Sequence, residues 1–406
     1  MRNKLLFDAI VWTFILFALT TITYSLWPGN LPINRIIGIL VIIELIVLYS
    51  IRSSSWEYLF ASLVCLCFVL SLGFTGDIND SILDGVYWVI TSLILLKFSD
   101  NEIRISLYNA INRNLAGIKR ASIILNIILA ISLMIPNCYS QSWGGSSYFI
   151  GFSPSEHTIA SGACLVLVLS LLSVRLETFR PLHLFLIFVP IAVVLFSGAR
   201  VFLIPAGILL LLYFGSVKIP TFIKGLFAPI FLILAVIVFV QSNMWEKFQL
   251  TLTSGFGLEN LDFLGAFTSG RSVFWLIDIN AFIQSTPLAI FFGNGFDYVY
   301  EVNSSLYGLR IWAHNDFIDI LLSVGLFGFF LYILAIGKSI VQMKRQSGSF
   351  FVVFLLAIYL LGPAFLNGFF VSQHLVYSYL LLSVIIHDKS NQIASINPVQ
   401  IKEGEQ

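Results

Sequence analysis

Long runs of apolar residues, separated by shorter polar segments, dominate the chain. A helix that crosses the hydrocarbon core of a bilayer needs about 20 apolar residues, and most of the runs come close to that length. The first run contains Asp8 and lacks a small-x-small cleavage site before Trp27, so we expect it to be retained rather than removed as a signal peptide. The pattern predicts twelve spanning helices, at residues 5–27, 33–51, 56–74, 81–97, 121–136, 157–174, 181–197, 200–217, 222–241, 316–337, 350–370 and 372–387.

The composition supports this prediction. Of the 406 residues, 58% are hydrophobic and 11% are charged, and the mean hydropathy is +0.94. Soluble domains are about 25% charged, so the composition excludes a soluble enzyme and a disordered scaffold. The net charge of +1, without a concentrated basic face, argues against a nucleic-acid partner. We predict an all-α polytopic membrane protein, a single membrane domain over residues 1–406 with about 12 transmembrane helices.

Lysine and arginine residues predict the orientation, because loops on the cytoplasmic side are enriched in them. With the N-terminus inside, 17 of the 22 basic residues fall on the inner side, and both termini are cytoplasmic. The five basic residues of the outer side are Arg35, Arg200, Lys247, Arg271 and Arg310.

One long loop, residues 242–315, is predicted on the outer side. Loops beyond about 15 residues are uncommon unless they are functional or disordered. Because this loop is rich in Phe and Trp, we expect it to be structured or to skim the membrane surface.

Within this loop, residues 271–285 have the pattern of an amphipathic helix. Ser269 and Gly270 are candidate caps before the helix, and Thr286-Pro287 ends it. The apolar face contains Leu276, Ile279 and Ile283, and a second face contains Arg271, Asp278 and Ser285. A turn is predicted further on, at Gly293-Asn294-Gly295.

The outer arginines are the first candidates for chemistry. A guanidinium stays charged at working pH and binds two phosphate oxygens at once. Arg200 ends the sequence FSGAR, and Arg271 begins the loop helix, where the helix N-terminus also attracts an anion. Arg310 lies four residues before His314. The alternative for each arginine is anchoring to lipid headgroups.

Further polar residues lie at predicted loop–membrane boundaries. His314, which can accept a proton near neutral pH, is followed by Asn315, Asp316 and Asp319. Glu156 and His157 either contact a substrate or cap the sixth span. Glu44 and Asp84 lie inside spans, where each is expected to pair with another helix. We find no metal-ligand spacing and no nucleotide-binding loop, so no cofactor is expected.

Several of these residues lie in motifs that resemble a known family. His314-Asn315, followed after nine residues by Gly325-Leu326-Phe327-Gly328, resembles the H-N/S-x9-G-x-x-G signature of the bacterial O-antigen ligase and polymerase superfamily. The sequence SGAR, ending at Arg200, resembles that family's Ser-Arg motif, with Ala199 where the family often has Ser. Residues 270–295 look like the family's periplasmic loop, and residues 151–162 are similar to its region before span six. The resemblance covers roughly residues 150–335.

The resemblance implies an inverting glycosyltransferase, without a metal, that uses an undecaprenyl-diphosphate-linked glycan at the periplasmic face of the inner membrane. Arg200 and Arg271 would bind the donor diphosphate, and His314 would act as the base or orient the acceptor. We assign Arg310, Asn315, Asp316, Glu156 and His157 to substrate binding. Partners would be the lipid-linked donor and acceptor, membrane lipid and a candidate chain-length regulator protein.

Three functions stay open at this point. A polymerase transfers the growing chain to a lipid-linked repeat unit, whereas a ligase transfers it to a lipid A core sugar. The sequence AHNDFIDIL at 313–321 looks more like polymerases, and a capsule polymerase is a variant of the same chemistry. A transporter or lipid flippase would instead place ionisable residues near the membrane midplane. Only Glu44 is predicted to lie that deep.

Overall fold

Helices make up most of the computed structural model, which describes residues 2–28, 33–74, 78–141, 147–174, 181–216, 271–308, 310–368 and 372–382, with single positions at 240, 245, 249, 268 and 370. The first nine helices are α1 (Arg2–Ile22), α2 (Ile33–Ile51), α3 (Ser55–Leu72), α4 (Ile78–Lys97), α5 (Asn101–Arg113), α6 (Leu115–Leu133), α7 (Glu156–Val174), α8 (Pro181–Ser197) and α9 (Leu203–Ser216). Later helices are α13 (Arg271–Ile283), α14 (Pro287–Phe292), α15 (Tyr298–Tyr307), α16 (Asp316–Ser347) and α17 (Phe350–Leu366), and residues 373–382 are also helical.

Shorter elements complete the described fold. Two strands, β1 (Tyr139–Gln141) and β2 (Ser147–Phe149), form an antiparallel pair. The 3-10 turns are η1 (Tyr24–Leu26), η2 (Pro136–Cys138) and η4 (Arg200–Phe202).

The helices confirm the all-α class, while the number of spans stays a prediction. Among the described residues, α1, α3, α6, α7 and α16 are long and apolar enough to cross a membrane, and the bent pair α4–α5 would make a sixth span. The apolar helices α2, α8 and α17 are shorter. The predicted span at 222–241 falls almost entirely outside the described residues.

The bend between α4 and α5 was not predicted from the apolar pattern. The two helices meet at 95°. Asp100 begins α5 as its N-cap, and its carboxylate accepts a hydrogen bond from the Glu102 backbone N–H at 2.8 Å. α5 is more polar than its neighbours, so the chain turns across the end of the bundle instead of continuing along it.

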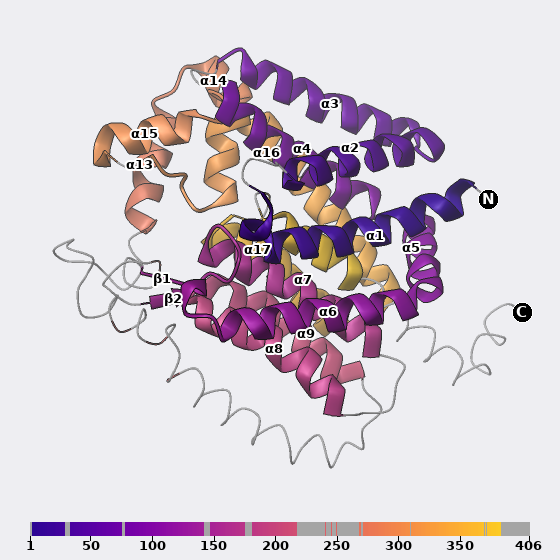
Figure 1. Ribbon diagram of the computed structural model, residues 1–406. Coiled ribbons are helices and arrows are strands. Elements are labelled where there is room, and N and C mark those ends of the chain that lie inside the picture. The colour runs from indigo at the N-terminus through magenta and orange to yellow at the C-terminus, as the bar shows by residue number, and fades with distance from the viewer. Residues whose placement is uncertain are drawn as a thin grey trace, which may run out of the picture.

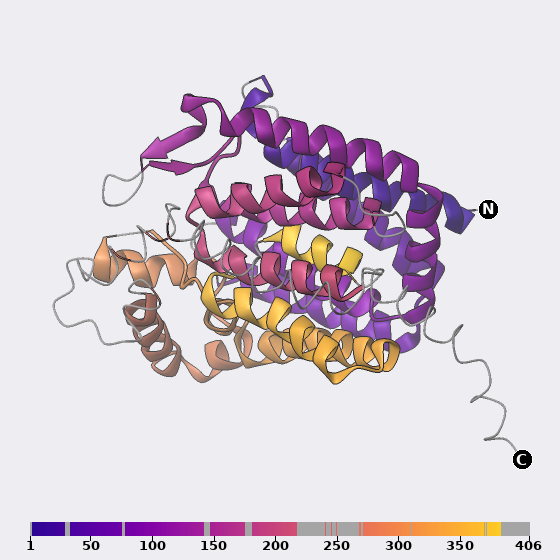
Figure 2. The same cartoon turned by 90° about the horizontal axis from the view of Figure 1, so that it is seen from below.

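The apolar helices run side by side, with the loop helices at one end (Figures 1 and 2). α13, α14, α15 and the β1–β2 pair gather at this end, which we call the loop end. α5 and the start of α1 lie at the opposite end. The ion pairs Arg52–Glu102, Lys97–Glu57 and Arg113–Asp8 connect helix termini there.

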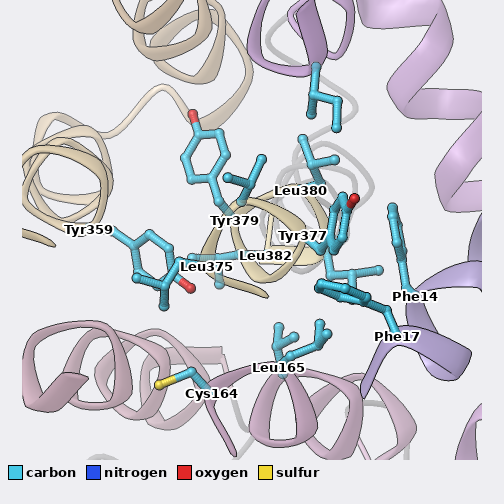
Figure 3. Packing of buried hydrophobic residues seen from close by; sticks show 14 of the residues in the cluster. Phe14, Phe17, Cys164, Leu165, Tyr359, Leu375, Tyr377, Tyr379, Leu380 and Leu382 are labelled. Carbon is cyan, nitrogen blue, oxygen red and sulfur yellow. The ribbon is translucent and has the colours of Figure 1, made fainter. Parts of the chain in front are cut away.

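Two helices that are buried on every face occupy the centre. Every described residue from Ile159 to the end of α7, and every residue of 373–382, is buried. Figure 3 shows the second helix, with Tyr377 beside Phe14 of α1 and Tyr379 near Tyr359 of α17. A helix without a polar face has to be surrounded by protein or lipid. The outer helices instead expose large apolar side chains, including Ile39, Ile43, Leu66, Val69, Ile127 and Phe354.

A hydrogen-bonded histidine joins the central helices to α1. His374 Nε2 lies 2.6 Å from the Thr21 hydroxyl, and His374 Nδ1 lies 3.0 Å from the Ser161 hydroxyl. The Phe17 ring stacks on the imidazole, with 4.4 Å between the ring centroids. Because both ring nitrogens have partners, this buried polar group fixes how α1, α7 and residues 373–382 pack.

α16 is broken at Gly325, which has φ 66° and ψ −169°. The backbone N–H groups of Asn294 and Gly295 donate to the carbonyls of Leu322 and Ser323, at 2.8 and 3.1 Å. The turn predicted at 293–295 therefore packs directly against the break. A Cβ at Gly325 would lie 2.4 Å from the Phe291 carbonyl carbon, so only glycine fits this approach.

We predict that Gly325→Ala lowers the apparent melting temperature in detergent by roughly 5 °C or more, because alanine at positive φ is strained and its methyl group meets backbone. Gly337→Ala is the matched control, since no atom lies within 4 Å of a Cβ at that position of the same helix. Equal melting temperatures for the two variants would contradict the role of the close approach.

Candidate functional site

His314 lies at the loop end in a strained backbone conformation. Its φ of 57° makes it the one non-glycine residue with positive φ among the described residues. The Ala313 N–H donates to Asp319 Oδ1 at 3.0 Å, and the Ala313 carbonyl accepts from Trp275 Nε1 at 2.8 Å. The Asn315 side chain caps α16 by accepting from the Phe317 N–H at 3.0 Å. Strain of this kind persists when hydrogen bonds on both sides fix the backbone, and it is concentrated at functional sites.

Asp316 connects the two arms of the broken helix. Its Oδ2 accepts hydrogen bonds from the Tyr332 hydroxyl at 2.8 Å and from the Phe370 N–H at 3.0 Å. In a straight helix, residues 16 positions apart would be separated by about 24 Å. The contact therefore requires the bend at Gly325, and it sets the position of His314 two residues earlier.

Arg271 begins α13, as predicted. The Thr268 hydroxyl accepts from the Ser272 N–H at 3.1 Å and satisfies a donor in the first turn. The predicted caps Ser269 and Gly270 lie outside the described residues. Arg271 Nη1 donates to the Leu366 carbonyl at the end of α17. The partner of this guanidinium is thus a neutral carbonyl.

The last turn of α17 supports the site from a second side. Trp312 Nε1 donates to the Asn367 carbonyl at 3.3 Å, and the Trp312 ring lies 4.6 Å from the His314 ring. The Trp275 ring contacts the Phe365 ring at 5.0 Å between centroids. In the sequence, Asn367 is distinguished only by its position at the end of an apolar run.

Electrostatic interactions connect the predicted residues. Burial, together with the positive charge of Arg200, lowers the pKa of Arg271 to about 10. Burial also lowers the pKa of His314 well below its usual value, as do Arg271 and His157, while the nearby Asn367 side chain acts in the opposite direction. At neutral pH, Arg271 is charged and His314 is neutral. The arrangement can bind an anion and accept a proton.

Arg200 reaches the site from a tight turn at the start of η4. Gly198 has φ 70°, and a Cβ there would lie 2.7 Å from the Tyr148 ring, so the motif needs glycine at this position. Tyr148 also interacts electrostatically with Arg200. The His157 ring at the start of α7 lies 6.0 Å from the Phe202 ring. Tyr148, which sequence analysis did not single out, completes this side of the site.

The other residues predicted to bind substrate have contacts of their own. Arg310 is exposed, and its guanidinium lies 5.6 Å from the centre of the Tyr300 ring. Glu156 is half-buried at the first position of α7. Asn315 and Asp316 bond to protein groups, as described above. Their roles in substrate binding stay predictions. Among the described residues, no group of three His, Cys, Asp or Glu side chains could hold a metal ion.

Two carboxylates inside predicted spans pair with other helices, as expected. Glu44 Oε1 accepts from the Thr13 hydroxyl of α1 at 2.7 Å. Asp84 Oδ2 accepts from the Tyr300 hydroxyl at 2.6 Å. Because Tyr300 belongs to α15, the second pair also connects the loop helices to α4. Ser81 adds a hydrogen bond to Asp297 at 3.1 Å.

Asp278, predicted on the polar face of the loop helix, is fully buried in α13. Burial raises the pKa of its carboxyl to about 7, and the nearby Asn303 side chain limits the rise. Asp278 also acts electrostatically on Asp319, which holds the His314 loop. Its protonation therefore bears on the stability of the site.

The fold and site define an all-α protein with apolar helices that could cross a membrane and a cationic site at one end. The chain matches no protein-family model and no curated protein. Its function has to be inferred from the residues of the site.

We predict that Asp278→Asn stabilises the protein at pH 8. The carboxyl has an unfolded pKa of about 3.9 and a folded pKa of about 7, so the wild type loses stability as the pH rises between these values. The gain at pH 8 is at most about 4 kcal/mol and decreases toward pH 4. Melting temperatures measured across this range check it. Glu301→Gln, at an exposed position, is the control. A gain that does not change with pH would contradict the prediction.

Proposed function

We propose that the protein is an inverting glycosyltransferase that uses polyprenyl-diphosphate-linked glycans. In this proposal it polymerises O-antigen repeat units at the periplasmic face of the bacterial inner membrane. The supporting observation is a series of electrostatic interactions between separate segments: Arg200 acts on Arg271, and both Arg271 and His157 act on His314. Their types and places fit the family that the sequence resembles.

The two arginines would hold the diphosphate of the donor. Arg200 acts electrostatically on Arg271, and both belong to a largely buried site where charges interact strongly. A diphosphate would relieve the repulsion between the two cations. When the bond from the anomeric carbon to the diphosphate breaks, negative charge grows on the leaving group. A fixed donor that stabilises such charge contributes about 3–4 kcal/mol.

His314 would collect the proton of the attacking hydroxyl. The acceptor oxygen bonds to the anomeric carbon, the diphosphate leaves from the opposite side, and the hydroxyl proton moves to the imidazole. The cations that depress the His314 pKa would be neutralised by the donor. His314 therefore becomes a stronger base when the donor is bound. The proton of the acceptor is then accepted most readily when both substrates are present.

The choice of a polymerase over a ligase rests on the resemblance of residues 313–321. The donor would be a lipid-linked glycan chain and the acceptor a single lipid-linked repeat unit. A glycan carried on a diphosphate is already activated, so the transfer needs no nucleotide.

Deleting the gene and separating the surface polysaccharide on a gel tests this proposal. A polymerase deletion leaves a single repeat unit on the lipid A core. Long lipid-linked chains that never reach the core would show a ligase instead. Unchanged polysaccharide would contradict both and favour transport.

Arg271→Ala and Arg271→Lys should each reduce polymer formation at least about 100-fold, because lysine cannot make the two-pronged contact with phosphate. Polymer length and amount in membranes with equal protein levels are the measurement. Arg345→Ala, exposed near the opposite end of the bundle, is the matched control. Polymer of normal length and amount in both Arg271 variants would remove this residue from the site.

His314→Asn should abolish polymerisation, because asparagine tolerates positive φ but cannot act as a base. His314→Gly also fits the backbone and leaves space for a small base. Added imidazole should therefore restore activity to His314→Gly and not to Arg271→Ala. Normal turnover in His314→Asn would show that His314 is not the base.

A further inference from the structure

The orientation of α13 is the reverse of that expected for a helix on the surface of a soluble protein. Its buried side chains include Ser272, Asp278 and the amphipathic Trp275. Three aliphatic side chains point outward, with exposed fractions of 66% for Leu276, 41% for Ile279 and 65% for Ile283. In water such an orientation would expose apolar surface and bury an ionisable group, both of which cost free energy.

The exposed apolar face continues onto α14. Leu288 and Phe291 are each 55% exposed. Residues 271–296 contain two charged residues, Arg271 and Asp278. Asp278 is fully buried. Arg271 is partly buried and donates a hydrogen bond to the end of α17. This stretch therefore presents no exposed carboxylate over two consecutive helices.

α15 in the same region has the ordinary orientation. It buries Val299 and Val302 and exposes Glu301, Ser304 and Ser305. α15 and the neighbouring helices α13 and α14 thus expose side chains of opposite polarity. α15 fits water, whereas the outward face of α13 and α14 fits hydrocarbon.

The apolar face is continuous with the exposed apolar surface of the bundle. α14 packs against α16 and α3, and Figure 1 shows it beside the loop end of α3. At that end α3 exposes Val69 and Leu70. Because α3 is long and apolar enough to cross a membrane, these side chains face lipid when it does, and α14 extends the same surface.

We propose that the outward face of α13 and α14 is immersed in the acyl chains of the membrane leaflet at the loop end. An amphipathic helix can lie in the plane of a bilayer with its apolar face buried about 5–10 Å deep, at the boundary between headgroups and acyl chains. α15, in contrast, stays in water. For the proposed glycosyltransferase, this places Arg271 beside the leaflet that would hold the polyprenyl chain; the immersion itself does not depend on that function.

Spin labelling tests the proposal. Cys65, Cys67, Cys138 and Cys164 are first replaced by Ala or Ser, and single cysteines are then placed at Leu276, Ile279, Ile283 and Phe291. The controls are Ser304 and Ser305 on α15, for water, and Phe354 on α17, for lipid. The full chain is reconstituted in phosphatidylethanolamine–phosphatidylglycerol vesicles. Power saturation compares the accessibility of each label to O2, which dissolves in lipid, and to a water-soluble nickel chelate.

The expected ratio of O2 to nickel accessibility at the α13 and α14 positions is several-fold higher than at Ser304 and Ser305, and close to that at Phe354. A ratio equal to that at the two serines would overturn the proposal. Exclusion of both reagents would show a protein cover instead of lipid, and dipolar broadening would show a second copy of the chain; either result also overturns it.

Each label replaces an exposed side chain, and elution of the variant as one species confirms folding. None of these results depends on catalysis, so they are independent of the polysaccharide test.

Discussion

The close approach of two backbone segments at Gly293 and Gly325 controls the geometry of the loop end. A break in a helix leaves carbonyls without their usual donors, and buried carbonyls need partners. The N–H groups of Asn294 and Gly295 supply those partners at Leu322 and Ser323. Because the break is stabilised in this way, the first arm of α16 can turn so that Asp316 reaches Tyr332 and the segment around His314 contacts α13 and the end of α17. The glycines of the two motifs thus allow the backbone contact that fixes this geometry.

Charge is distributed unevenly between the two ends of the bundle. Ion pairs such as Lys97–Glu57 and Arg113–Asp8 lie at the end opposite the loop helices. At the loop end, Arg271 interacts with a second cation, Arg200, and with a backbone carbonyl. Such an arrangement costs stability, because two positive charges repel each other in a partly buried site. Sites of this kind are pre-organised for a ligand, and the strained backbone of His314 fits the same interpretation.

The candidate site residues can be picked out from the sequence because charge is rare in this chain. Arg200, Arg271, His157 and His314 stand out from apolar surroundings, and the structure brings them together. The contributions of Tyr148 and Asn367 come from packing between distant segments. No local pattern marks an asparagine at the end of an apolar helix as a neighbour of a histidine 53 positions earlier.

The sequence by itself determined that the chain is mostly helical, that several helices are apolar enough to enter a membrane, and which few polar residues need an explanation. Apolar length and the scarcity of charge are local properties, so they can be read along the chain. Only the tertiary structure decided that α7 and residues 373–382 are central, that α16 is broken, and which face of α13 points inward. Hydrophobicity cannot decide such questions, because lipid and protein interior are equally apolar. The choice between them depends on shape and on which buried polar groups find partners.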